Sequence, residues 1–191
     1  MKRRTPDAEL QTQNDRYVLY VGRLELKKNI LGIIEAYNEL RQKNPQISNK
    51  LVLTGGKGFG WEKITSVISA SAFKNDIVLK GYVAESEKND LLQNAAVFLY
   101  TSFYEGFGMP ILEAQNSGLP VITSNVSSMP EIAGRGAILV DPSNPEQIAA
   151  AISKILSDEN LRNNLIKSGF ENIKRFSWEK CARETLKVLT S

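Results

Sequence analysis

The sequence predicts an α/β fold: a three-layer, Rossmann-like domain with a doubly wound parallel sheet of about six strands. Short runs rich in β-branched and aromatic residues alternate with longer stretches whose apolar residues fall on one helical face. The short runs are apolar at successive positions, as expected of parallel strands that helices cover on both faces. The length of 191 residues, with 42% of them hydrophobic, is ample for one full core.

Six strands are expected, each from a short apolar run. They cover residues 17–21, 51–54, 77–81, 97–101, 120–123 and 136–140. With right-handed crossovers, the order expected for six such strands is 3-2-1-4-5-6. Strands 1 and 4 are then neighbours, and the chain diverges to opposite sides between them. Ligands bind at the carboxyl ends of such a pair, so a site is expected in the loops after residues 21 and 101.

The stretches between and after the strands are expected to form helices. The first follows Asn29, a residue suited to an N-cap, and has on one face the apolar residues Ile30, Ile33, Ile34, Tyr37 and Leu40. Asp158 and Ser177 stand where the last two helices should be capped. The remaining helices are expected over about residues 61–73 and 85–94, from Pro110 onward, and over 145–157, 159–174 and 178–189.

Composition excludes several classes of function. The absence of His excludes a Ser-His-Asp system, His-ligated zinc and a His general base within this chain. The single Cys cannot form an internal disulfide, and a net charge of +3 is too small to indicate a nucleic-acid partner. No segment is apolar enough to span a membrane, and the basic start lacks the apolar stretch of a signal peptide. A cytoplasmic location is expected, with at most peripheral contact with the membrane. Residues 1–15 are typical of a linker, which leaves residues 16–191 as the domain.

The loop after the fourth strand has the chemistry of a sugar-nucleotide site. Gly106 and Gly108 let backbone amides approach a ligand closely, and Pro110 suits the first position of a helix whose positive N-terminus favours a phosphate. Glu105 precedes this helix, and Glu113 is expected in its first turn. Carboxylates accept hydrogen bonds from hydroxyls, so one Glu would hold a sugar and the other a ribose.

The loop after the first strand adds two cations to the same place. Arg23 follows the strand directly and Lys28 precedes the next helix, so both are expected to neutralise a diphosphate. They would also stabilise a departing diphosphate without a metal, in agreement with the absence of an Asp-x-Asp pair. Each feature alone has a plainer explanation, such as a solvated charge, a turn glycine or an acid that favours a helix N-terminus. The joint occurrence of these residues favours a ligand site.

The motifs in these loops resemble those of a known enzyme family. They are YVGRLELKKN, LVLTGG, the GYV at residues 81–83, YEGFGMPILEAQNSGLPVITSN and SSMPEIAGRGAILVDPSNPEQIAAAI. Together they resemble the C-terminal, donor-binding domain of retaining GT-B glycosyltransferases, especially glycosyltransferase family 4, the group 1 transferases. The resemblance runs from about Tyr17 to Leu189 and implies the C-terminal half of a GT-B fold.

The resemblance implies a role for each motif residue. Arg23 and Lys28 would contact the donor diphosphate, and Glu105 would lie by the transferred sugar, as nucleophile or stabiliser. Glu113 would bind the ribose hydroxyls. The resemblance further implies that Phe107, Gly108 and Met109, after the turn at Gly106, offer backbone amides to the sugar and the phosphates. It also implies that Tyr82 and Val83 border the base.

The resemblance also implies the reaction and leaves its details open. A mannose- or glucose-type hexose would pass from a GDP- or UDP-linked donor to a glycan or lipid-linked saccharide, with no cofactor and no metal. The family's N-terminal acceptor domain is absent here, so we expect an isolated donor domain that is inactive alone. The last helix would run back onto the absent domain and so expose its apolar face here. A stand-alone nucleotide or nucleotide-sugar binding module and a UDP-sugar 2-epimerase-like protein are alternatives. A nicotinamide dehydrogenase is a poor one, because GRLELKKN replaces the G-x-G-x-x-G loop.

Overall fold

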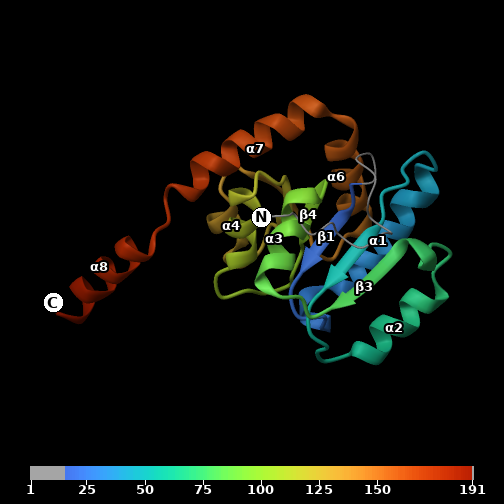
Figure 1. Ribbon diagram of the computed structural model, residues 1–191, viewed down its shortest axis with the longest axis horizontal. Coiled ribbons are helices and arrows are strands. Elements are labelled where there is room, and N and C mark those ends of the chain that lie inside the picture. Colours follow the sequence, from blue (N-terminus) through green and yellow to red (C-terminus); the bar gives the residue numbers. More distant parts are fainter. Residues whose placement is uncertain (1–15, 191) are drawn as a thin grey trace.

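The protein folds around a six-stranded, all-parallel sheet with the order β3-β2-β1-β4-β5-β6, which confirms the order expected from the sequence (Figure 1). The computed structural model describes residues 16–190, so the segment predicted to be a linker, residues 1–15, lies outside the described residues. The strands are β1 Val18–Val21, β2 Leu51–Thr54, β3 Ile77–Gly81, β4 Val97–Tyr100, β5 Val121–Ser124 and β6 Ala137–Val140. β1 and β4 pair directly at the centre, with Val18 opposite Val97 and Leu19 opposite Phe98.

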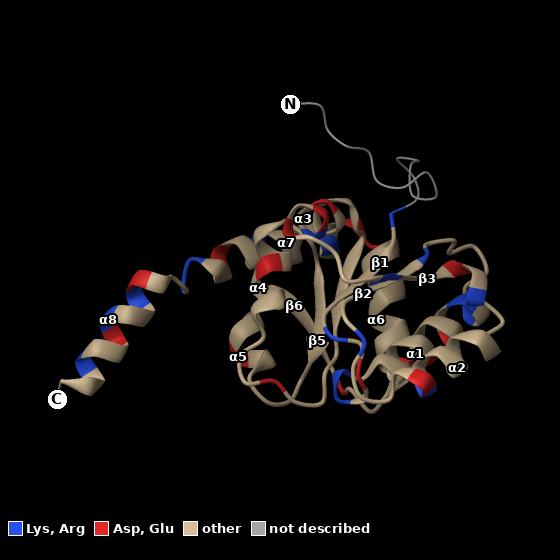
Figure 2. Cartoon of the chain, turned by 60° about the horizontal axis from the view of Figure 1, so that its bottom comes forward, with Lys and Arg blue, Asp and Glu red and all other residues tan. Residues whose placement is uncertain are grey.

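Helices cover both faces of the sheet and complete a three-layer, doubly wound architecture. α1, α2 and α6 lie on one face, and α3, α4 and α5 lie on the other, while α7 packs against α4 and α6 (Figure 2). The helices are α1 Ile30–Lys43, α2 Trp61–Ala70, α3 Glu85–Asn94, α4 Met109–Asn116, α5 Met129–Ala133, α6 Pro145–Ser157, α7 Glu159–Ile173 and α8 Trp178–Leu189. β1, β2, β4 and β5 are almost wholly buried, as their apolar runs require.

Several local expectations are corrected by the structure. α2 ends at Ala70 because a separate 3-10 turn forms over Lys74–Asp76. α4 begins at Met109, one residue before Pro110, so Glu113 lies just beyond the first turn and not within it. The short helix α5 was not expected at all. Asp158 and Ser177 cap their helices through their side chains, as expected. Asn29 occupies the N-cap position of α1 in a left-handed conformation, with a φ of 59°, and makes no capping bond, while its amide nitrogen donates to the carbonyl of Pro142 at 2.6 Å.

A buried polar bridge fixes α7 against α4 and α5. The amide of Gln115 donates to the carbonyl of Ala133 at 2.9 Å, and the amide of Asn172 donates to Gln115 Oε1 at 2.8 Å. Asn172 also donates to the carbonyl of Ile132 at 2.7 Å. Gly136 packs so closely that a Cβ there would lie 2.6 Å from the amide nitrogen of Gln115. Because buried amides are costly without partners, this bridge holds α4, which leads from the candidate site, in one place.

The last helix, α8, projects away from the domain (Figure 1). It has no buried residue, and the side chains of Trp178, Leu186 and Leu189 are largely exposed. This agrees with the expectation that its apolar face is exposed. Among the residues that the structure describes, no helix is both long and apolar enough to cross a bilayer.

Candidate functional site

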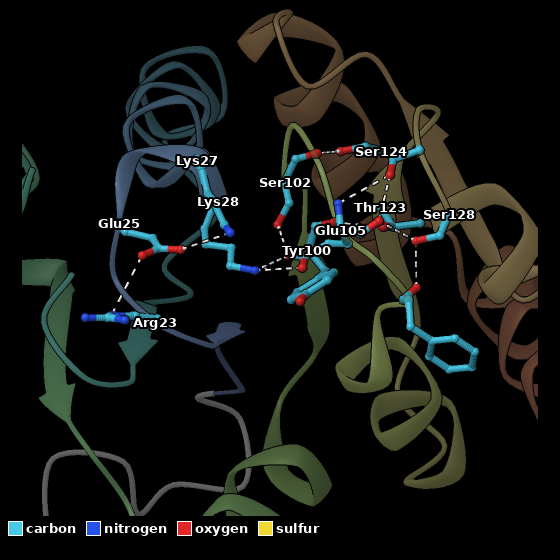
Figure 3. A network of polar contacts seen from close by, with 12 residues as sticks. Arg23, Glu25, Lys27, Lys28, Tyr100, Ser102, Glu105, Thr123, Ser124 and Ser128 are labelled. Atoms are coloured by element: carbon cyan, nitrogen blue, oxygen red, sulfur yellow. Dashed lines mark hydrogen bonds and ion pairs between the residues drawn. The ribbon is translucent and has the colours of Figure 1, made fainter. Parts of the chain in front are cut away.

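An ion pair between Lys28 and Glu105 joins the loops that follow β1 and β4. The ammonium of Lys28 lies 2.6 Å from both carboxylate oxygens of Glu105, and the two side chains are only 14% and 10% exposed (Figure 3). The backbone reinforces the junction, because the N–H of Phe103 donates to the carbonyl of Lys27 at 3.1 Å. The structure therefore brings together two of the residues that the sequence predicted to share a site, at the carboxyl ends of the two central strands.

Glu105 is held in its ionised form by its neighbours. Burial opposes the charge, but hydrogen bonds from Lys28, Ser102 and Tyr100 outweigh it and lower the pKa of Glu105 below its ordinary value of 4.5. The hydroxyl of Ser102 donates to Glu105 Oε1 at 2.7 Å. Burial, followed by the neighbouring carboxylate of Glu105, raises the pKa of Tyr100 far above its ordinary value, so its hydroxyl stays protonated. The site thus contains a carboxylate that stays charged well below neutral pH and faces a cation.

A row of four hydroxyl residues fixes the backbone of the β4–α4 loop. This hydroxyl row consists of Thr123, Ser124, Ser127 and Ser128, at the end of β5 and just after it. Thr123 donates to the carbonyl of Tyr100 at 2.8 Å, and Ser124 donates to that of Ser102 at 2.6 Å (Figure 3). Ser127 and Ser128 donate to the carbonyl of Glu105 at 2.7 and 3.0 Å, and Ser128 also donates to that of Phe107 at 2.8 Å. Every second or third carbonyl of this loop is therefore held by the neighbouring strand and its extension, which sets the position of Glu105.

The start of α4 presents backbone amides next to this loop. Gly108 occupies the N-cap position with a φ of 107°, a conformation that L side chains rarely adopt. A Cβ at Gly106 would meet open space, so that residue leaves room beside the loop. The ring of Phe107 packs edge-on against that of Phe176, with 5.9 Å between the ring centroids, and it remains partly exposed. The side chain of Met109 is also partly exposed. The N-terminus of α4 carries a partial positive charge, so an anion is favoured here.

Glu113 takes part in a second charge cluster, which joins α4 to α3. Its Oε2 lies 3.0 Å from the ammonium of Lys88, which belongs to α3. Lys88 also lies 3.0 Å from Oε1 of Glu85. Burial would lower the pKa of Lys88, but the two carboxylates outweigh it and raise that pKa. Glu113 is therefore positioned by a neighbouring helix, and not only by its own.

Three further predicted residues, Arg23, Tyr82 and Val83, are in neither charge cluster. Arg23 is 67% exposed and lies 3.7 Å from Glu25, and it does not contact Lys28 or Glu105. Tyr82, after β3, is almost fully exposed, whereas Val83 packs against the core. The structure brings Lys28 to Glu105, pairs Glu113 with Lys88, and leaves Arg23 and Tyr82 at the surface.

Sequence reasoning missed the residues that position the site. The hydroxyl row, Lys88 and Glu25 were not singled out, although Ser127 and Ser128 lie within a motif that carried the family resemblance. A hydroxyl in a loop has no distinctive pattern in a single sequence. Lys88 could have been found from its place in the first turn of α3, because that turn starts at the carboxyl edge of β3.

Comparison with known proteins gives one consistent family. The family model described as glycosyl transferases group 1 matches residues 1–172. The O-antigen chain mannosyltransferase B of Escherichia coli is 36% identical over 170 residues, which are 89% of this chain and 44% of that protein. A probable sucrose-phosphate synthase 2 of Oryza sativa subsp. japonica is 30% identical over 194 aligned residues, with 91% of this chain and 20% of that protein covered. The chain spans less than half the length of either relative.

Two solved structures share the fold of this chain. A sucrose-phosphate synthase from Thermosynechococcus elongatus superposes with a TM-score of 0.80 at 26% identity and covers 94% of this chain and 46% of that one. A protein from Anabaena, solved in complex with UDP and glucose, superposes with a TM-score of 0.78 at 22% identity, over 94% and 49% of the two chains. The second likeness concerns the fold alone.

Proposed function

Since the chain belongs to the group 1 glycosyl transferases, we propose that it supplies the donor side of a retaining, metal-independent hexosyl transfer. The donor is a nucleoside diphosphate sugar, and the acceptor is a glycan or a lipid-linked saccharide, reached at the cytoplasmic side of the membrane. The observation that carries this proposal is the pairing of Lys28 with Glu105 at 2.6 Å, beside the N-terminus of α4. A cation, a carboxylate and outward-facing amides then meet at one edge of the sheet.

Each part of this arrangement suits one part of the donor. The diphosphate would lie against the amides at the start of α4, and the ammonium of Lys28 would move from Glu105 to the phosphate oxygens. Arg23 is exposed, lies 3.7 Å from Glu25 and donates a long hydrogen bond of 3.4 Å to the carbonyl of Lys57; it would leave these contacts and swing toward the same oxygens. When the bond between the sugar and the diphosphate breaks, negative charge grows on the departing phosphate. Two cations and a helix N-terminus stabilise that charge.

Glu105 is assigned to the transferred sugar. Its carboxylate would accept hydrogen bonds from sugar hydroxyls and face the positive charge that develops at the anomeric carbon, either as a nucleophile or as a stabiliser. The lowered pKa of Glu105 supports this assignment, because both roles need the ionised form. The acceptor hydroxyl would pass its proton to an oxygen of the departing diphosphate as it attacks, and it must be held by a second surface that also excludes water. For this reason we expect the described domain alone to bind the donor and not to transfer the sugar.

The nucleoside would lie on the side of Glu113. Its carboxylate would accept hydrogen bonds from the ribose, and Tyr82 and Val83 would border the base. A guanine or uracil base fits this proposal. The E. coli relative is named a mannosyltransferase and the Oryza sativa relative a sucrose-phosphate synthase, which supports a donor hexose of the mannose or glucose type.

Calorimetric titration with UDP, GDP and dTDP, without metal and then with Mg²⁺, tests the proposal. One nucleotide should bind saturably, and Mg²⁺ should not change its affinity. Lys28→Met should weaken that binding at least tenfold, because a charge-assisted contact to phosphate is lost. Lys154→Met is the matched control, since it removes a cation from the last turn of α6, a helix on the sheet face opposite to α4. Failure of all three nucleotides to bind would contradict the proposed function.

A further inference from the structure

Lys88 is the residue through which α3 reaches the candidate site. Its ammonium is 3.0 Å from Oε2 of Glu113 on α4 and 3.0 Å from Oε1 of Glu85 on its own helix. The side chain of Lys88 is 16% exposed, that of Glu113 is 34% exposed and that of Glu85 is 76% exposed. The contact to Glu113 is therefore the more sheltered of the two, and the contact to Glu85 lies in solvent, where an ion pair contributes little.

The contact leaves half of the Glu113 carboxylate available to a ligand. Oε2 is occupied by Lys88, while Oε1 accepts no hydrogen bond from any residue that the structure describes. A carboxylate with one oxygen held by a cation has a fixed plane and a fixed direction for its other oxygen. A long Glu side chain without such a contact would lose several rotamers when it bound a hydroxyl, and that ordering weakens binding.

We propose that Lys88 is a positioning residue for ribose recognition: it orients the Glu113 carboxylate so that its other oxygen accepts a hydrogen bond from a ribose hydroxyl of the donor nucleotide. This inference rests on the proposed function and adds a residue from a separate helix to it. Lys88 itself does not contact the donor. Its effect reaches the nucleotide through Glu113 and depends on the ribose hydroxyls being present.

This role makes a prediction that a purely structural ion pair does not. A contact that only ties α3 to α4 would alter stability, and any effect on nucleotide affinity would be the same for every nucleotide. A cation that touched the phosphates directly would also act equally on ribonucleotides and dideoxynucleotides. Positioning through Glu113 acts only where a hydroxyl is available to the carboxylate.

The experiment compares a ribonucleoside diphosphate with its 2′,3′-dideoxy analogue by calorimetry. The base is the one that the wild-type protein binds. We expect the wild-type protein to prefer the ribonucleotide by at least tenfold, and Glu113→Gln to remove most of this preference. Lys88→Met should reduce the preference severalfold through weaker ribonucleotide binding, with the affinity for the dideoxy analogue nearly unchanged. Lys88→Arg, which restores a cation, should recover part of the preference.

Glu85→Gln is the matched control, because it removes the exposed partner of Lys88 and leaves the contact to Glu113 in place. It should leave the ribose preference as in the wild type. Thermal unfolding of each variant verifies that it is folded. Equal losses for both nucleotides in Lys88→Met, or no loss for either, would overturn the role of Lys88 while the proposed function stands. Absence of binding of every nucleoside diphosphate to the wild-type protein would overturn both.

Discussion

Replacing Glu105 by Gln should destabilise the empty protein and at the same time strengthen its binding of a free nucleoside diphosphate. Gln keeps the shape of the side chain and can still accept the hydrogen bond from Ser102, but it removes the charge that Lys28 faces at 2.6 Å. Two consequences follow from one change. The folded state loses an ion pair, and the ammonium of Lys28 becomes available to phosphate.

The size of each effect follows from the geometry. Two unit charges about 3 Å apart attract by about 5 kcal/mol at an effective dielectric constant of about 20. Desolvation of two sheltered side chains offsets much of this, so we expect a net loss of about 2 kcal/mol in the free energy of unfolding. For a domain of this size that loss lowers Tm by roughly 4–8 °C. Removal of a nearby negative charge should strengthen nucleotide binding about tenfold, which corresponds to about 1.4 kcal/mol.

Thermal unfolding followed by circular dichroism measures the first effect, and calorimetry with UDP or GDP measures the second. Glu39→Gln is the matched control, because it makes the same change in net charge away from the site. Glu39 lies about 14 Å along α1 from its first residue, Ile30, which is close to Lys28 in the chain. There Lys43 keeps its second partner, Glu146, at 2.8 Å, so we expect little change in Tm or affinity. A Glu105→Gln protein with unchanged Tm and unchanged or weaker nucleotide binding would refute the reasoning.

Three further outcomes are expected. The folded protein lowers the pKa of Glu105, so the ionised carboxylate contributes its full stabilisation above the ordinary pKa of 4.5 and loses it as the pH falls through the pKa of the folded state. Denaturant titrations below pH 4.5 should therefore show a steeper loss of stability with falling pH in the wild type than in Glu105→Gln. Asn172→Leu leaves the buried amide of Gln115 without one partner, so urea unfolding should report a loss of about 1–3 kcal/mol. Leu186→Ser on exposed α8 should change the free energy of unfolding of this domain by less than about 0.5 kcal/mol, and a larger loss would show that α8 packs against the domain.

The fold was predictable because its signals are local and repeated. Six apolar runs separated by helical stretches suffice to define a parallel sheet, and the handedness of crossovers then leaves few strand orders. α5 was missed because its five residues are too few to show a helical period. The end of α2 was misplaced because Phe73 continues the apolar pattern, although the backbone has already left the helix.

The candidate site was predictable in its residues and not in its contacts. Lys28 and Glu105 could be assigned to one place from the strand order alone, but their direct pairing depends on how two irregular loops meet. The partner of Glu113 could not be predicted, because Lys88 is one of several charges on α3 and most such charges are solvated. Hydroxyl donors such as Ser128 leave no pattern, since the carbonyls that they bind belong to any residue type.

The hydroxyl row holds the β4–α4 loop by hydrogen bonds to its backbone and not to the side chains on the loop's outward surface. The carbonyls are held from residues 123–128, while the side chains of Phe103 and Tyr104 extend outward and are largely exposed. A chimera that receives residues 102–109 from another family member can therefore keep residues 123–128 of this chain, because these hydroxyls bind backbone carbonyls that every residue type supplies. Phe103 and Tyr104 can likewise be varied without loss of the hydroxyl contacts that hold the loop, since only the loop's backbone takes part in those contacts.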